Sequence, residues 1–283
     1  MKLNLNNDFD LINNLIDINV INTEIGNLIY IDDFLRYPDI FYNFFNDDNL
    51  LNSDFKSTYY PGKEINMNST LKIEFDDFTD KYIKQYLNLS NLYEMIHSDY
   101  TFRLINKKNN ELIFENMLPH NHIPYTINDQ NNFYYNGISS CLYLYNKNNI
   151  SNGTSFYKEN IKIKGGLLKK KLKYSNNKPI YDNETLNYKN YKNECEYLKK
   201  ILENPMYNAD KENILFKKIY SIDAKFNRIV FFSNNFFHNF DVNNQYYNHI
   251  NDMDHKRYTI VGISFYGNRF NINQQELNYL LNK

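Results

Sequence analysis

Between about residue 100 and residue 266 the chain carries short runs in which apolar and polar side chains alternate, and this period of two predicts β-strands. Strands of this length and spacing are typical of a sandwich or barrel, whereas alternating strand and helix patterns would indicate a parallel α/β sheet. We therefore predict a mainly β fold with flanking helices, of the α+β class. The runs lie at residues 102–104, 112–114, 138–145, 154–157, around 219, 226–232 and 258–266.

Helical patterns are confined to the N-terminal third, to an insertion and to the last residues of the chain. Residues 1–26 have a weak apolar pattern and are predicted as a short helix or an arm, before a strand at 28–31. Further helices are predicted from Pro38, with Ile40, Phe41, Phe44 and Phe45 on one face, and at 76–96, 186–204 and 273–282. The predicted domains are an N-terminal arm, residues 1–27, and one β domain, residues 28–283, with a Lys- and Tyr-rich insertion at about 158–215.

Composition excludes several classes of protein. Apolar residues make up 42% of the chain and aromatic residues 17%, which is too much for a disordered protein. The 32 basic and 33 acidic residues nearly balance, so no nucleic-acid partner is predicted. No stretch reaches the roughly 18 apolar residues of a membrane helix, and the first residues lack the pattern of a signal peptide. Two cysteines are too few for a disulfide framework, so we expect a soluble, cytoplasmic protein with no membrane partner.

Three of the six histidines are spaced so that they can bind one metal ion. His120 and His122 follow Leu118-Pro119, and in an extended segment residues two apart point to the same side. His238 follows the strand predicted at 226–232 after a short turn. Two ligands on one strand and a distant histidine on another build a facial site, which leaves the remaining positions of the ion for substrate and oxygen. The alternative is that the first two are loop residues and the third ends a strand.

An ordered set of short motifs surrounds these histidines. The motifs are Ile31-Asp32-Asp33-Phe34-Leu35-Arg36-Tyr37-Pro38-Asp39, Tyr60-Pro61-Gly62, Leu118-Pro119-His120, Gly153-Thr154-Ser155-Phe156-Tyr157, Phe226-Asn227-Arg228 and Arg257-Tyr258-Thr259. In this order the set resembles the 2-oxoglutarate/Fe(II)-dependent oxygenase superfamily and, more narrowly, a bacterial and phage branch of it. The resemblance covers roughly residues 28–266. It implies a double-stranded β-helix, that is, a jelly-roll or cupin-like barrel.

The same resemblance implies roles for individual residues. His120 is expected to be the first ligand of Fe(II), and His238 the distal ligand. Arg257 is expected to bind the remote carboxylate of the cosubstrate 2-oxoglutarate, because a guanidinium pairs with both carboxylate oxygens and stays charged. Thr259 and Tyr143 are expected to donate hydroxyl hydrogen bonds to that carboxylate. Two alternatives stay open: Arg257 belongs to a surface ion pair, and Tyr143 packs in the core.

The ligand pattern departs from the superfamily at one position. Where the family has His-x-Asp, this chain has His120-Asn121-His122, so His122 is the third expected ligand. Three imidazoles also suit zinc, nickel or copper, so the ligand types alone do not imply iron. A carboxylate from Asp129 or Asp241 restores the usual set if it reaches the ion, and another His-x-Asp occurs at His97-Ser98-Asp99. These alternatives also stay open.

Three function hypotheses follow. The first is an Fe(II)/2-oxoglutarate-dependent dioxygenase that hydroxylates a small molecule or a protein side chain. The second is a catalytically inactive barrel that acts as a binding or structural protein, for which His122 in place of a carboxylate is the chief evidence. The third is a cupin-like protein that holds zinc or another metal on three histidines. No phosphate-binding loop, nucleophile elbow or Cys-x-x-Cys pair points to other chemistry.

Overall fold

The computed structural model describes residues 1–5, 8–46, 63–67, 69–89, 93–105, 120, 122, 136–145, 153–159, 172–175, 178–181, 216–240 and 257–267. Some of the features predicted from the sequence lie outside these residues. They are the Tyr60-Pro61-Gly62 turn, the strand at 112–114, the helices at 186–204 and 273–282, and the carboxylates Asp129 and Asp241.

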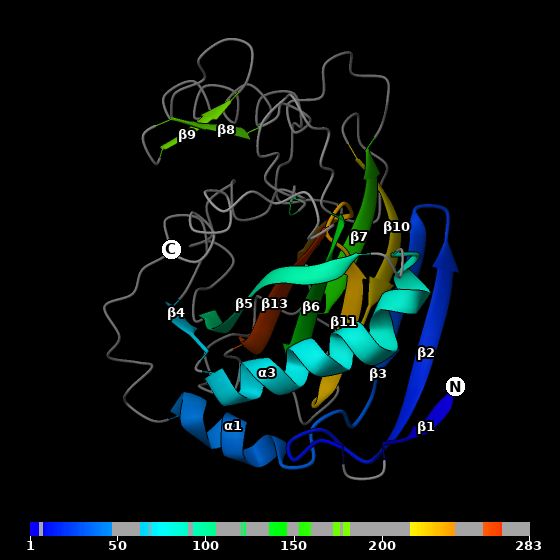
Figure 1. Cartoon of the computed structure of the whole chain (residues 1–283), viewed down its shortest axis with the longest axis vertical. Helices are drawn as coiled ribbons and strands as arrows, with labels where there is room; N and C mark the ends of the chain where they lie inside the picture. The colour runs from blue at the N-terminus through cyan, green and yellow to red at the C-terminus, as the bar shows by residue number, and fades with distance from the viewer. Residues whose placement is uncertain are drawn as a thin grey trace, which may run out of the picture.

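An eight-stranded antiparallel sheet forms the body of the fold (Figure 1). Its strand order is β1-β2-β3-β11-β6-β13-β5-β4, so strands from both ends of the chain lie next to each other. The bounds are Lys2–Asn4 for β1, Leu15–Thr23 for β2, Gly26–Ile31 for β3, Lys63–Asn66 for β4, Glu94–Ile105 for β5, Asn136–Tyr143 for β6, Arg228–Ser233 for β11 and Arg257–Gly267 for β13.

A smaller sheet has the order β10-β7-β12, and a separate hairpin pairs β8 with β9. Within the described residues these sheets do not close into one barrel, and the arrangement is sandwich-like. The predicted mainly β fold is confirmed, because every predicted strand from residue 100 onward that is described overlaps an observed strand. The bounds are Thr154–Glu159 for β7, Leu172–Ser175 for β8, Lys178–Tyr181 for β9, Phe216–Ile222 for β10 and Phe237–Phe240 for β12.

The small sheet packs against one face of the large sheet. Phe156 of β7 lies edge-on to Phe232 of β11, with ring centroids 5.0 Å apart. The hydroxyls of Tyr143 in β6 and Thr154 in β7 are 2.6 Å apart, so a hydrogen bond also joins the two sheets. Since alternate residues of a strand point to opposite faces, these contacts define which residues face the interior of the sandwich.

The helices cover the other face of the large sheet (Figure 1). α3, Ser69–Phe78, places Phe75 against Tyr100 of β5 and Phe78 near Phe231 of β11. It continues through a π-helical turn, Thr79–Ile83, and a 3₁₀ turn, Lys84–Leu87, and ends at Asn88 in the left-handed conformation. α1, Pro38–Asn46, begins at a proline, which suits the first helical position.

Two motifs that are far apart in the sequence dock onto each other. Arg228 at the start of β11 binds both carboxylate oxygens of Asp32, at 2.6 and 3.1 Å. The side chain of Asn227 accepts a hydrogen bond from the Leu35 amide at 2.8 Å and donates one to the Leu35 carbonyl at 2.9 Å. Asn227 has a φ of 62°, a conformation that asparagine tolerates better than most residues. The Asp-Asp-Phe-Leu and Phe-Asn-Arg motifs are therefore structural partners.

Two predictions near the N-terminus are wrong. Residues 1–26, expected as a helix or an arm, form β1 and β2 and extend the large sheet beyond β3. Buried Ile16 and Ile18 alternate with exposed Leu15 and Asp17, and the exposed leucine hides this period of two in the sequence. The helix expected at 76–96 begins instead at Ser69, and β5 begins at Glu94.

Candidate metal centre

A hairpin between the two sheets positions His238. β11 belongs to the large sheet and β12 to the small one, and the turn between them contains Asn234. Asn234 is fully buried and accepts a hydrogen bond from the Ser139 hydroxyl at 2.6 Å, while its amide donates to the Ser264 carbonyl at 3.1 Å. A Cβ on Gly137 would lie 1.9 Å from this amide nitrogen, so only glycine fits there. The turn is thus fixed to β6 and β13.

His120 forms an isolated antiparallel bridge with His238 of β12. The amide of His120 donates to the His238 carbonyl at 3.0 Å, and the amide of His238 donates to the His120 carbonyl at 2.8 Å. Two residues on, the His122 amide donates to the Asn234 carbonyl at 2.9 Å. The imidazoles of His120 and His122 both lie against the His238 ring, as the spacing predicted.

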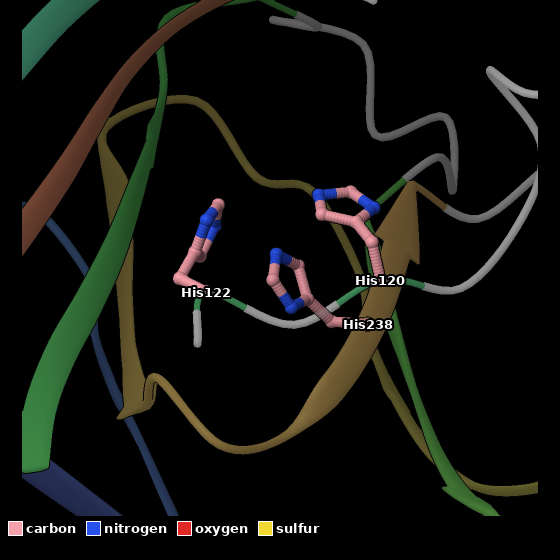
Figure 2. A group of neighbouring side chains, drawn as sticks. All are labelled: His120, His122 and His238. Carbon is pink, nitrogen blue, oxygen red and sulfur yellow. The ribbon is translucent and has the colours of Figure 1, made fainter. Parts of the chain in front are cut away.

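The three imidazoles meet in space (Figure 2). Ring centroids are 4.5 Å apart for His120 and His238, 5.0 Å for His122 and His238, and 5.4 Å for His120 and His122. One ring nitrogen from each residue lies within 4.8 Å of the others, and the group can hold a metal ion. Metal–nitrogen bonds of about 2.0–2.1 Å bring ligand nitrogens to about 3–3.5 Å from one another, so binding requires ring movements of no more than about 1 Å. The expected convergence of the three histidines is confirmed.

The surroundings of His238 prepare it as a ligand. Its Nδ1 lies 3.0 Å from the Phe236 carbonyl, which only accepts, so Nδ1 carries the proton and Nε2 presents a lone pair. Burial lowers the pKa of His238 and of His122 well below 6.5, and the neighbouring imidazoles and Arg103 lower both further. At neutral pH both rings are therefore uncharged, which is the form that binds a metal.

The residues expected to bind the cosubstrate lie on the interior face of the large sheet. Thr259 is directly opposite Tyr143, and Arg257 is two residues away on the same face of β13. Arg257 is only 9% exposed and donates from Nη2 to the Gly153 carbonyl at 3.2 Å, so the surface ion pair is wrong. Tyr143 is fully buried, and its hydroxyl forms a hydrogen bond with the Thr154 hydroxyl, which agrees with the alternative that Tyr143 packs in the core.

Comparison with known families gives one match. Residues 13–263 match a family of unknown function, DUF6445. The chain belongs to this family. No curated protein and no solved structure matches this chain. Among the described helices, none combines the length and the apolar character that crossing a membrane requires.

The second His-x-Asp of the sequence serves another purpose. His97 and Asp99 lie on β5 and bind each other, with Nε2 and Oδ2 2.8 Å apart, and the His97 ring stacks on Phe265. Neither belongs to the group of three histidines. The alternative ligand register at residues 97–99 therefore finds no support in the described part of the chain.

Two residues of the centre were missed by sequence reasoning. Asn234 was treated only as part of a turn, although it anchors the hairpin and binds the His122 backbone. Arg103 lay in a run predicted as a strand, and its guanidinium is close enough to lower the pKa of His122 and His238. The alternating pattern of the strand predicts which side of the sheet Arg103 is on, but it does not predict which strands of the other sheet pack on that side.

Proposed function

We propose that this protein is a non-haem oxygenase that binds Fe(II) on His120, His122 and His238 and uses 2-oxoglutarate to hydroxylate a small molecule or a protein side chain. The observation that carries the proposal is the convergence of three imidazoles beside an interior sheet face that bears a buried arginine. Such chemistry requires a metal site and a buried positive charge on facing sheets. The cosubstrate binds the ion through one of its carboxylates and the fixed positive charge through the other.

Strand pairing supports a jelly roll as the finer description of the fold. In such a fold a long hairpin is rolled up, so that the first strand pairs with the last, the second with the second-last, and so on inward. The pairs here are β5 with β13, the His120 segment with β12, β6 with β11, and β7 with β10. The order of these pairs along the chain matches that nesting.

The chain's own residues fit the metal and the cosubstrate. His238 offers Nε2 because Nδ1–H is donated to the Phe236 carbonyl, and this bond also fixes the plane of the ring. Arg257 supplies a charge that is held between the rings of Tyr143, Tyr145 and Phe240, 5.4 to 5.8 Å from the guanidinium carbon. These aromatic walls keep the carboxylate-binding position dry, which strengthens its pairing with an anion.

When bound, Fe(II) would let dioxygen oxidise both 2-oxoglutarate and the substrate: one oxygen atom would go into succinate, formed with release of carbon dioxide, and the other into the new hydroxyl group on the C–H carbon. The protein binds, orients and excludes water. Phe232 and Phe156 pack against each other, and the Phe232 ring lies 4.5 Å from the His238 ring. These two phenylalanines separate the site from the interior of the sandwich. Thr259, 2% exposed, places its hydroxyl on the face that bears Arg257.

The donor set favours one second candidate. All three members of the described metal group are imidazoles, and three histidines also make a good zinc site. A zinc protein with this fold has no use for 2-oxoglutarate.

One experiment separates the two functions. Metal-free protein is loaded anaerobically with Fe(II) or with Zn(II), 2-oxoglutarate binding is measured by calorimetry, and succinate is measured after air is admitted. The proposal predicts that 2-oxoglutarate binds the Fe(II) protein and that succinate forms slowly without added substrate. Tight Zn(II) binding, with neither 2-oxoglutarate binding nor succinate from the Fe(II) protein, would establish the second candidate instead.

A further inference from the structure

A second arginine shares the sheet face of Arg257. Arg103 on β5 is directly opposite Thr259 on β13, which is in turn opposite Tyr143 on β6. Opposite residues of antiparallel strands share a face, and Arg257 lies two residues from Thr259 on that face. The Tyr143 hydroxyl contacts Thr154 of the small sheet, so this is the interior face.

β12, which carries His238, packs on β13, the strand next to the β5 strand of Arg103: Phe240 of β12 lies 5.4 Å from the guanidinium carbon of Arg257. The Arg103 Nε is 2.6 Å from a carboxylate oxygen of Glu64, its neighbour across β4 and β5, and this ion pair orients the guanidinium. Arg103 and Arg257 thus lie on neighbouring strands of the interior face, on the side where β12 packs.

The third histidine changes the electrostatics of this site. Compared with a His-x-Asp ligand set, His122 leaves a divalent ion with one more uncompensated positive charge. The remaining open positions of the ion therefore favour a negatively charged occupant. A guanidinium binds a carboxylate through two parallel hydrogen bonds, with geometric specificity as well as charge.

We infer that the primary substrate carries a carboxylate, and that Arg103 binds this carboxylate next to the metal while Arg257 binds 2-oxoglutarate. This inference rests on the proposed function, because Arg257 must already be occupied by the cosubstrate. It assigns Arg103 as the residue that selects an acidic substrate, and Glu64 as the residue that orients Arg103. The competing explanation is that Arg103 and Glu64 only tie β4 to β5.

Acetate is the probe for this position. The protein is loaded with paramagnetic Co(II) and saturated with 2-oxoglutarate, and acetate is titrated while the relaxation of its methyl protons is followed by NMR; the Zn(II) form gives the diamagnetic baseline. The parent is expected to bind acetate close to the ion. Arg103→Gln should weaken acetate binding by about tenfold or more, the loss expected for a charge-assisted hydrogen bond. Arg36→Gln is the matched control, because that guanidinium binds Phe9, Ile12 and Asn14 instead.

Glu64→Gln provides the second variant, for the case that Arg103→Gln does not fold. Glutamine keeps an amide oxygen that accepts from Arg103 Nε and so still orients the guanidinium, but it no longer offsets the Arg103 charge, so acetate should bind at least about twofold more tightly. Unchanged or weaker acetate binding in Glu64→Gln, or unchanged binding in a folded Arg103→Gln, overturns the inference. A parent that binds Co(II) and 2-oxoglutarate but no acetate overturns the inference alone, whereas a parent that binds no Co(II) overturns the proposed function with it.

Discussion

Replacement of Asn227 by alanine should be among the most destabilising single substitutions in this protein. The side chain pairs with both the amide and the carbonyl of Leu35, which is 1% exposed. The Leu35 carbonyl also accepts from the Asn13 side chain at 3.4 Å, so the Leu35 amide is the group left without a partner, at a cost of about 1–3 kcal/mol. Alanine also resists the φ of 62°, at a cost of about 1–2 kcal/mol. Together these losses amount to about 2–5 kcal/mol, a large share of the roughly 5–15 kcal/mol that stabilises a typical domain.

Urea unfolding at 25 °C, followed by far-UV circular dichroism, measures this loss. Asn227→Gly removes the same hydrogen bonds without the backbone strain, so it should be more stable than Asn227→Ala by about 1 kcal/mol. Asn19→Ala is the control, because its amide bonds the Asp17 carbonyl at an exposed position and should change stability by less than about 0.5 kcal/mol. An alanine variant within about 1 kcal/mol of the parent would refute the reasoning, as would equal stability of the alanine and glycine variants.

Three further substitutions test neighbouring parts of the account. Arg257→Gln should weaken 2-oxoglutarate binding to the metal-loaded protein by about 10- to 150-fold in calorimetry, with metal content unchanged; unaltered affinity removes Arg257 from the site. Tyr143→Phe should cost about 1 kcal/mol in urea unfolding, because Thr154 loses its partner; lower 2-oxoglutarate affinity at unchanged stability would instead assign Tyr143 to the cosubstrate. Burial raises the pKa of Asp32, but hydrogen bonds from Arg228 and Lys225 outweigh burial and bring the pKa below 3.8. The ionised carboxylate therefore stabilises the fold above that pH, and this stabilisation is lost as the pH falls through the lowered pKa. Asp32→Asn should therefore make unfolding less pH-dependent below about pH 4, and an unchanged acid profile would exclude this pair as a cause.

Local pattern was enough to predict most strands of the sandwich. β5, β6, β7, β11 and β13 each follow runs of alternating or continuous apolar residues, and such runs depend little on distant partners. β2 was missed because Leu15 is apolar yet 75% exposed, so the pattern alone does not show which face is buried. The helix after residue 69 was placed late because its charged residues obscure the apolar spacing of Leu71, Phe75 and Phe78.

The spacing of the histidines predicted the ligands of the site, but it did not predict the residues that hold those ligands in place. The interval between His120 and His122 determines that both point the same way in an extended segment, so their convergence was predictable. The anchoring of Asn234 depends on Ser139 and Ser264, which lie 95 and 30 residues away, and no local pattern signals such contacts. The Phe-Asn-Arg motif precedes His238 in the pattern that resembles the oxygenase superfamily, but its asparagine, Asn227, binds Leu35, 192 residues earlier in the chain.

Calorimetric titration of Zn(II) into metal-free protein tests the central claim, that the three histidines bind one ion. It is performed at about pH 7.5, above the ordinary imidazole pKa of 6.5, so that the ligands are neutral. The parent should bind one equivalent. His238→Ala should weaken binding by at least about a hundredfold, since loss of a mere supporting contact already costs up to that much. His122→Ala should also weaken it, and His97→Ala, which removes a histidine paired with Asp99, should bind as the parent does. A parent that binds no ion, or a His238→Ala variant with the parent's affinity, would contradict the account.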